Sequence, residues 1–251
     1  MRRIAVINQK GGVGKTTITT NLGHALALKG YRVTVVDLDP QGQLAASLGM
    51  FRPPVEGVDQ VLLNGAELES AVINTRDLLQ LVSAGNNLQQ VEELRGGGAA
   101  RASILKNALE GQFSDQDFIL FDCPPSAGIL VSNAMFAADE VLIPVSGDYL
   151  SLSGLAKMMM TLKRFEPYLE KPHEKWIEMS RVYPRRRLFR EVCNKLLGHF
   201  PGQVLANPIK EAAVMAECPG VGRTIFEYRR SSQSAKEFEA LATDLLERRT
   251  M

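Results

Sequence analysis

Residues 4–17 read IAVINQKGGVGKTT, a short apolar run followed by a glycine-rich loop with two lysines. The apolar run has the length of a buried strand, and a helical pattern from Thr16 to Lys29 stops at Gly30. A strand, a GGVGKT loop and a helix in this order are the context of a phosphate-binding loop. Backbone N–H groups of such a loop surround phosphates, Lys15 reaches the β and γ phosphates, and the Thr16 hydroxyl ligates Mg²⁺.

Apolar runs of strand length recur along the chain and alternate with helical patterns. They are Ile4–Ile7, Val33–Val36, Leu78–Val82, Phe118–Phe121 and Val141–Val145. This alternation predicts an α/β fold with a doubly wound, mostly parallel sheet flanked by helices, as in P-loop NTPases.

Helical patterns are also expected at Leu88–Leu94, Ala99–Leu109 and Ser234–Arg248. Prolines and glycines predict surface loops at Phe51–Gly57 and Gly96–Gly98. Because neither loop is long enough to separate two domains, residues 1–251 are expected to form a single domain.

The composition limits the classes of function. The 29 basic and 28 acidic side chains nearly balance, which argues against a wholly basic nucleic-acid packager and against an acidic disordered chain. Cys123, Cys193 and Cys218 form no CxxC pair, so we expect reduced thiols in the cytoplasm. The N-terminal apolar run is too short for a signal peptide, and no window is long enough to cross a bilayer.

Lys10 is an additional cation in the loop. A second ammonium so close to Lys15 is repelled unless phosphate lies between the two. The segment Lys10–Thr16 resembles the deviant loop KGGxGKT of the ParA and MinD family of ATPases. The resemblance implies that Lys10 reaches across a dimer interface to the partner's nucleotide and stabilises the transferring phosphoryl group like an arginine finger.

Two further motifs carry the resemblance. Residues 35–42 read VVDLDPQG and residues 121–126 read FDCPPS, and each places aspartate where a buried strand ends, as α/β sheets place their ligands. The resemblance implies that Asp39 orients or activates the attacking water, that Asp122 holds the Mg²⁺ shell and that Asp37 helps with either task. Aspartates at strand ends also cap helices, which is the structural alternative.

The implied cofactors are ATP and Mg²⁺. The residues expected to bind ATP are Lys10, Gly11, Gly12, Val13, Gly14, Lys15, Thr16 and Thr17. Catalytic roles fall to Lys10, Lys15 and Asp39, and metal binding to Thr16, Asp39 and Asp122. Residues 183–185, Tyr-Pro-Arg, depart from the family pattern in the region of the base-contacting loop, so no adenine ligand is assigned.

A local excess of positive charge runs from Lys157 to Lys195, with eleven Lys or Arg against five Glu. At helical spacing Arg186, Arg187 and Arg190 share an exposed face. The resemblance to DNA-segregating relatives adds three positions, although another basic position of those relatives is Val214 here. The DNA-binding candidates are Arg185, Arg186, Arg187, Arg190, Lys210 and Arg223. The alternative is an ordinary solvated helix face.

The resemblance implies a homodimer with ATP that binds double-stranded DNA non-specifically and is nucleoid-associated in the cytoplasm. A ParB-like or cargo-adaptor protein would stimulate its slow hydrolysis, so that it segregates or positions a plasmid, a chromosome or a protein-based compartment. No stable membrane insertion is expected.

Four alternatives stay open. A MinD-like membrane switch needs a cationic amphipathic C-terminal helix, whereas Glu237, Glu239, Asp244 and Glu247 would be repelled by anionic lipid. An iron–sulfur carrier needs paired cysteine ligands, and the three cysteines instead suggest buried or half-buried side chains. A bacterial tyrosine kinase needs a tyrosine-rich tail. A nucleotide-holding scaffold requires an inactive Asp39.

Overall fold

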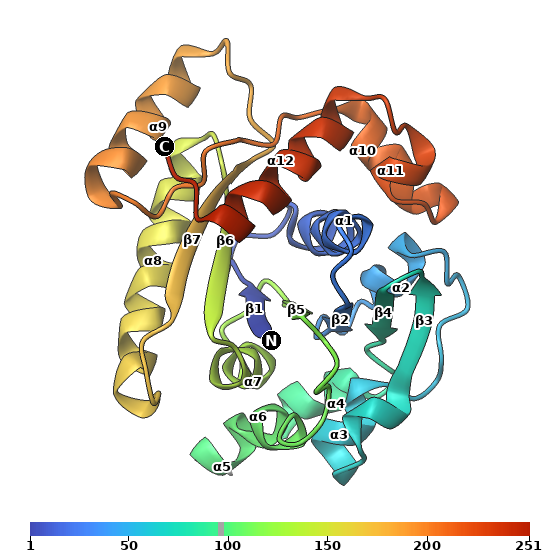
Figure 1. Ribbon diagram of the computed structural model, residues 1–251. Coiled ribbons are helices and arrows are strands. Elements are labelled where there is room, and N and C mark those ends of the chain that lie inside the picture. Colours follow the sequence, from blue (N-terminus) through green and yellow to red (C-terminus); the bar gives the residue numbers. More distant parts are fainter. Residues whose placement is uncertain (95–97) are drawn as a thin grey trace.

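The computed structural model describes residues 1–94 and 98–251, and a seven-stranded sheet is its central layer (Figure 1). The strand order is β3-β4-β2-β5-β1-β6-β7, and only β3 runs antiparallel to its neighbour. The strands are β1 Arg2–Val6, β2 Val33–Asp37, β3 Val72–Arg76, β4 Leu79–Val82, β5 Phe118–Asp122, β6 Glu140–Ser146 and β7 Glu174–Ser180. The prediction of a mostly parallel α/β sheet is confirmed.

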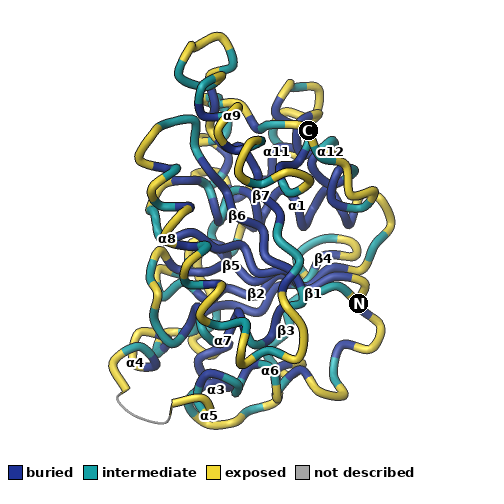
Figure 2. Tube along the Cα trace, turned by 90° about the vertical axis from the view of Figure 1, so that its left-hand side faces the viewer, coloured by how far each residue is buried: buried dark blue, intermediate teal, exposed yellow. Residues whose placement is uncertain are grey.

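Helices cover both faces of the sheet, and the central strands are buried between them (Figure 2). One face carries α1 Lys15–Leu28, α2 Gln43–Ser47, α10 Ala213–Glu217, α11 Ile225–Tyr228 and α12 Gln233–Glu247. The other carries α3 Val58–Asn64, α4 Leu88–Glu93, α5 Gly98–Ala102, α6 Ile104–Ala108, α7 Ile129–Ala137, α8 Tyr149–Phe165 and α9 Arg187–His199. Short 3-10 helices lie at Leu68–Ala71, Glu166–Tyr168 and Cys218–Val221.

Alternate residues along a strand contribute their side chains to the two different hydrophobic cores. Ile4 and Val6 of β1 pack on the α1 side, whereas Ala5 and Ile7 pack on the α7 side. Because a parallel strand covered on both faces is apolar at nearly every position, such strands are easy to recognise in a sequence.

Both edge strands escaped prediction. β3 is half exposed and reads VINTR, and β7 reads EKWIEMS, where charged residues interrupt the apolar pattern. The expected helix Ala99–Leu109 is two short helices that meet at Ser103. The expected loop at Gly96–Gly98 lies outside the described residues except for Gly98, which begins α5, while Phe51–Gly57 is a loop as expected.

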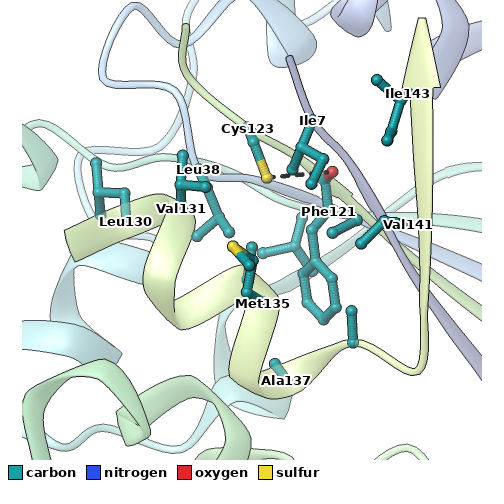
Figure 3. Packing of buried hydrophobic residues seen from close by; sticks show 14 of the residues in the cluster. Ile7, Leu38, Phe121, Cys123, Leu130, Val131, Met135, Ala137, Val141 and Ile143 are labelled. Atoms are coloured by element: carbon teal, nitrogen blue, oxygen red, sulfur yellow. Dashed lines mark hydrogen bonds between the residues drawn. The ribbon is translucent and has the colours of Figure 1, made fainter. Parts of the chain in front are cut away.

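Phe121 lies at the centre of the larger core and anchors the end of β5 (Figure 3). Its ring is fully buried among apolar side chains, including Met135 of α7 and Val141 of β6. The Cys123 thiol packs beside it and contacts the Phe121 carbonyl oxygen at 3.7 Å. Packing on both sides therefore fixes the position of Asp122, the residue between them.

We expect Phe121→Ala to lower the free energy of unfolding by about 3–5 kcal/mol, because it removes a fully buried ring and leaves a cavity. Urea denaturation followed by circular dichroism measures this change. Phe51→Ala is the matched control, since that ring is 61% exposed and its loss should cost about 0.5 kcal/mol or less. Similar costs for the two variants would contradict the central role of Phe121.

Candidate nucleotide-binding site

A cavity of about 480 Å³ opens at the carboxyl ends of the parallel strands. The glycine-rich loop and the first turn of α1 form one end, and Ile209–Ala212 with Met215 and Phe238 form the other. Asp39, Pro125, Ser180 and Arg181 also line the cavity. The size and the place in the sheet are typical of a site for a nucleotide.

The loop has the backbone conformation that phosphate binding requires. Gly12 and Gly14 have φ angles of 73° and 90°, a region that strains any other L-residue, and Gly14 directly precedes α1. The end of β7 supports the loop, because the Ser180 hydroxyl donates to the Val13 carbonyl at 2.7 Å and the Arg181 guanidinium donates to the Gly12 carbonyl. The N-terminal N–H groups of α1 therefore meet the cavity at a fixed position.

Lys15 is buried beside this loop, with an exposed fraction of 7%. Its Nζ lies 3.5 Å from the Lys10 carbonyl oxygen. Burial lowers the pKa of Lys15, and the nearby carboxyl of Asp122 opposes this effect. A buried ammonium beside a phosphate loop gains strongly from a phosphate ligand.

Asp37 and Asp39 have different positions, although only Leu38 separates them. Asp37 is fully buried, and its oxygens accept hydrogen bonds from the N–H groups of Asp39 at 3.0 Å and Leu44 at 3.2 Å. Burial, followed by the charge of Asp122, raises the pKa of Asp37 well above its ordinary range. Asp39 lines the cavity, and its Oδ1 accepts from the Gln41 N–H at 3.0 Å. Asp37 therefore shapes the turn that presents Asp39.

Asp122 offers an unused oxygen atom. Its Oδ1 accepts from the Thr19 hydroxyl at 3.2 Å, whereas its buried Oδ2 has no hydrogen-bond partner among residues 1–94 and 98–251. Burial raises the pKa of Asp122 to about 7, against the opposing effects of the nearby Thr16 hydroxyl and the charge of Lys15. A buried carboxylate oxygen without a partner beside a threonine hydroxyl is suited to the shell of a metal ion.

The oxygen donors at this end of the cavity fit Mg²⁺. Thr16, Asp39 and Asp122 carry oxygen atoms of the kind that Mg²⁺ prefers, and Mg²⁺ in nucleotide sites takes one or two such ligands together with phosphate oxygens and waters. Within the part of the chain that the structure describes, no group of three or more His, Cys, Asp or Glu could hold a metal alone. The site therefore suits a metal that arrives with phosphate.

Lys10 does not point into its own loop. Its Nζ contacts Asp148 at 2.9 and 3.0 Å, the Ser151 hydroxyl at 2.9 Å and the Ser146 hydroxyl at 3.4 Å. Burial alone would raise the pKa of Asp148, but hydrogen bonds from Lys10, Ser146 and Ser151 lower it to about 2. Asp148 is also the N-cap of α8 and accepts from the Ser151 N–H at 2.9 Å. The single chain thus holds its additional lysine in an anionic cradle.

The six DNA-binding candidates lie in three places. Arg185, Arg186, Arg187 and Arg190 are exposed at the start of α9, where Arg186 stacks over the Tyr183 ring at 4.1 Å and Arg187 pairs with Glu191 at 2.7 Å. Lys210 lines the nucleotide cavity and pairs with Glu237 at 2.9 Å. Arg223 is exposed beside a small cleft near Thr17 and Met215. Their role in DNA binding stays a prediction.

Sequence reasoning missed the far half of the cavity. It assigned no base-contacting residue, yet Arg181 and the segment Ile209–Ala212 line this half. Arg181 directly follows β7. Because that strand was not predicted, the position of Arg181 at the carboxyl edge of the sheet could not be predicted either. Its positive φ of 52° is unusual for an arginine and has no signature in the sequence.

The remaining expectations concern cysteines and membrane spans. All three cysteines are free thiols, with Cys123 and Cys218 buried and Cys193 half buried, as predicted. No helix among the described residues is long and apolar enough to span a bilayer.

Comparison with known proteins places this site in a family. Residues 1–174 match the family described as AAA domain. The chromosome partitioning protein ParA of Myxococcus xanthus is 34% identical, over 99% of this chain and 89% of its own length. The sporulation initiation inhibitor protein Soj of Bacillus subtilis is 34% identical, over 96% of this chain and 97% of its own. The chain belongs to the ParA/MinD family of P-loop ATPases. This confirms the family predicted from the loop.

Solved structures agree with the fold of the family. Cobyrinic acid a,c-diamide synthase from Mycobacterium smegmatis, with bound ADP and magnesium, is 32% identical with a TM-score of 0.81, over 98% of this chain and 94% of that one. Apo McdA from Cyanothece has a TM-score of 0.86 at 20% identity over 98% and 99%, which shows the fold alone. The predicted cofactors, ATP and Mg²⁺, are confirmed at the level of the family.

The raised pKa of Asp122 predicts a pH dependence of stability in protein free of nucleotide and Mg²⁺. The folded pKa, about 7, exceeds the ordinary 3.8, so folding favours the protonated carboxyl. That stabilisation is fully present below the ordinary pKa and is lost as pH rises through about 7. Since Asp122→Asn cannot ionise there, the wild type should lose stability relative to the variant between about pH 5 and about pH 8.

Urea denaturation of both proteins across this pH range measures the difference. Asp37 and Glu178, whose pKa values burial also raises, are present in both proteins. Because the charge of Asp122 also raises the pKa of Asp37, the difference between the two proteins reports on this pair of carboxyl groups. A difference in unfolding free energy that stays constant with pH would rule out the titration of Asp122.

Proposed function

We propose that this chain is an ATP-switched dimer that binds DNA non-specifically in its ATP state and positions a cargo. The observation that carries the proposal is the cradle around Lys10, since a lysine whose ammonium is turned from its own loop onto Asp148 and Ser151 is available to a second subunit. Relatives matched over almost their whole length are named for chromosome partitioning, which supports the cargo role. The protein would be nucleoid-associated in the cytoplasm.

The cavity accommodates Mg·ATP in one orientation. The triphosphate lies against Lys10–Thr17, because the N–H groups and Lys15 are there. The base lies at the far end, where Met215 and Phe238 supply apolar surface and Ile209–Ala212 supply backbone. Thr16, Asp39 and Asp122 hold Mg²⁺, which neutralises charge on the phosphates.

Dimerisation moves Lys10 from Asp148 to the nucleotide of the partner subunit. A triphosphate carries more negative charge than one carboxylate, so the exchange is favourable when a second nucleotide comes within reach. Tyr149 and Leu150 follow Asp148 directly and are 49% and 76% exposed, which is apolar surface suited to a contact between two copies. ATP thus joins the two subunits through Lys10. ADP lacks the γ phosphate and attracts this lysine less.

Hydrolysis reverses the switch. Asp39 orients the attacking water from the rim of the cavity, where a turn anchored by Asp37 presents it. Lys15 stabilises charge on the phosphates, and loss of the γ phosphate weakens the hold on Lys10. A ParB-like or cargo-adaptor protein accelerates hydrolysis. Residues 1–251 act as one domain in this cycle.

A membrane-attached switch is less compatible with the packing of α12. Phe238, Leu241 and Leu245 are fully buried against the sheet, so the apolar face of this helix already belongs to the core. Two acidic residues of the same helix, Glu237 and Asp244, are buried as well, which also opposes its release. Releasing α12 to a lipid surface would expose all five side chains.

Lys10→Ala should abolish ATP-dependent dimers while the monomer still binds ATP. Asp148→Asn should increase the affinity of the ATP dimer about tenfold, because it releases Lys10 from its ion pair. Analytical ultracentrifugation with ATP and with ADP measures both. Asp139→Asn is the matched control, because Asp139 pairs with Arg3 at the opposite end of the sheet. Normal ATP-dependent dimers of Lys10→Ala would refute the trans role.

DNA binding is tested with a random-sequence duplex in the presence of ATP or ADP. Wild type with ATP should bind, and raising salt from about 50 to about 200 mM should weaken binding roughly a hundredfold if about four phosphates are neutralised. The double variant Arg185→Ala, Arg187→Ala should dimerise normally and bind at least about tenfold more weakly.

The control for this experiment is Arg32→Ala, an exposed arginine at the start of β2 that pairs with Asp115. Unchanged affinity of the double variant at low salt would move the DNA surface elsewhere. ATP turnover without ammonia or glutamine also separates this proposal from amide synthesis, the activity named for the Mycobacterium smegmatis neighbour.

A further inference from the structure

Three buried carboxyl groups stand behind the segment Asn207–Ala212, here called the base loop, of which Ile209–Ala212 line the cavity. Glu178 belongs to β7, and Glu237 and Asp244 belong to α12. Their exposed fractions are 0%, 5% and 0%. Buried acids are costly unless hydrogen bonds or charges compensate them, so three behind one loop need a reason.

Each of these groups accepts a hydrogen bond from the backbone of the base loop. Asp244 accepts from the Asn207 N–H at 2.8 Å and Glu237 from the Lys210 N–H at 3.0 Å. Glu178 accepts from the Ile209 N–H at 3.2 Å and shares this donor with the Met179 carbonyl oxygen at 2.9 Å. Asp244 also accepts from the Asn207 side-chain amide at 2.9 and 3.0 Å. Glu237 additionally holds the Lys210 ammonium, so it fixes that residue at both ends.

As a result, the base loop has no spare backbone donor from residue 207 to residue 211. Position 208 is a proline, and the Glu211 N–H donates to the Val182 carbonyl at 3.0 Å. These residues can still accept hydrogen bonds through their backbone carbonyl oxygens. Their backbone therefore suits the donating 6-amino group of adenine better than the accepting 6-carbonyl oxygen of guanine.

We propose that Glu178, Glu237 and Asp244 are positioning residues that hold the base loop in the conformation that recognises adenine. This inference rests on the placement of the base in the proposed function. Burial raises the pKa of Glu178 well above its ordinary range, and the neighbouring acids Asp244 and Glu237 add to this effect. Its Oε1 accepts from the Ile209 N–H, and a glutamine can supply an acceptor oxygen at the same position without a charge.

The decisive variant is Asp244→Ala in the full chain, with Mg²⁺ and three probes: ADP, GDP and inorganic pyrophosphate. Isothermal titration calorimetry should show that ADP binds about tenfold or more weakly. The reason is that the backbone N–H and the side-chain amide of Asn207 both lose their acceptor. Pyrophosphate binding should change less than about twofold, since the phosphate loop is untouched. The preference for ADP over GDP should narrow.

Two variants of Glu178 provide a rescue test. Glu178→Gln retains an acceptor and no charge, so it should keep the wild-type preference for ADP. Glu178→Met removes the acceptor and should lose that preference. These variants decide the question on their own if Asp244→Ala does not fold.

Asp59→Ala is the control for a purely structural effect. Asp59 is also fully buried and accepts backbone N–H groups of Gly57, Gln60 and Asn87, but it lies on the α3 side of the sheet. It should lower the melting temperature without changing the ratio of ADP to pyrophosphate affinity.

Equal weakening of ADP and pyrophosphate binding by Asp244→Ala would overturn the inference, as would an unchanged ADP preference in both Asp244→Ala and Glu178→Met. A wild type that binds ADP no more tightly than pyrophosphate would instead refute the placement of the base, and the positioning role with it.

Discussion

The central place of β1, between β5 and β6, is the constraint on which the site depends. The parallel register sets Val6 beside Asp122 on one side and beside Leu142 on the other, while Asp37 faces Asp122 across β2 and β5. The chain leaving β1 therefore emerges among three strand ends. The phosphate loop, the acidic residues and the cradle of Lys10 at the end of β6 come together because these strands end at the same edge.

The core and the site are coupled through single residues. Phe121 is fully buried in the core on the α7 side and directly precedes Asp122, and Ser180 ends β7 and directly supports the phosphate loop. Rigid packing of apolar strands thus supplies the precision that a charged site needs. Charged groups in or beside the cavity meanwhile have protein partners: Lys10 pairs with Asp148, Lys210 with Glu237 and Arg181 with Glu211.

The sequence predicted the centre of the molecule better than its edges. The five strands at the centre of the sheet consist mainly of apolar residues, and the glycines and lysines of the loop have a spacing that few other structures require. β3 and β7 were missed because a half-exposed edge and buried acids such as Glu178 break the apolar pattern. The base loop follows β7, so the far half of the cavity was missed with it.

The pairing of Lys10 in a single chain could not have been read from the sequence, because Asp148 lies far away along the chain and its role depends on the register of β6. The pair is about one-third exposed, at 31% and 39% of the side chains, so solvent screens it and the ion pair is worth about 1 kcal/mol or less. Asp148 keeps its capping bond to Ser151 when the lysine leaves. A weak, replaceable contact at a fixed position suits a switch, since it holds Lys10 away from its own phosphates and yields when a better anion arrives.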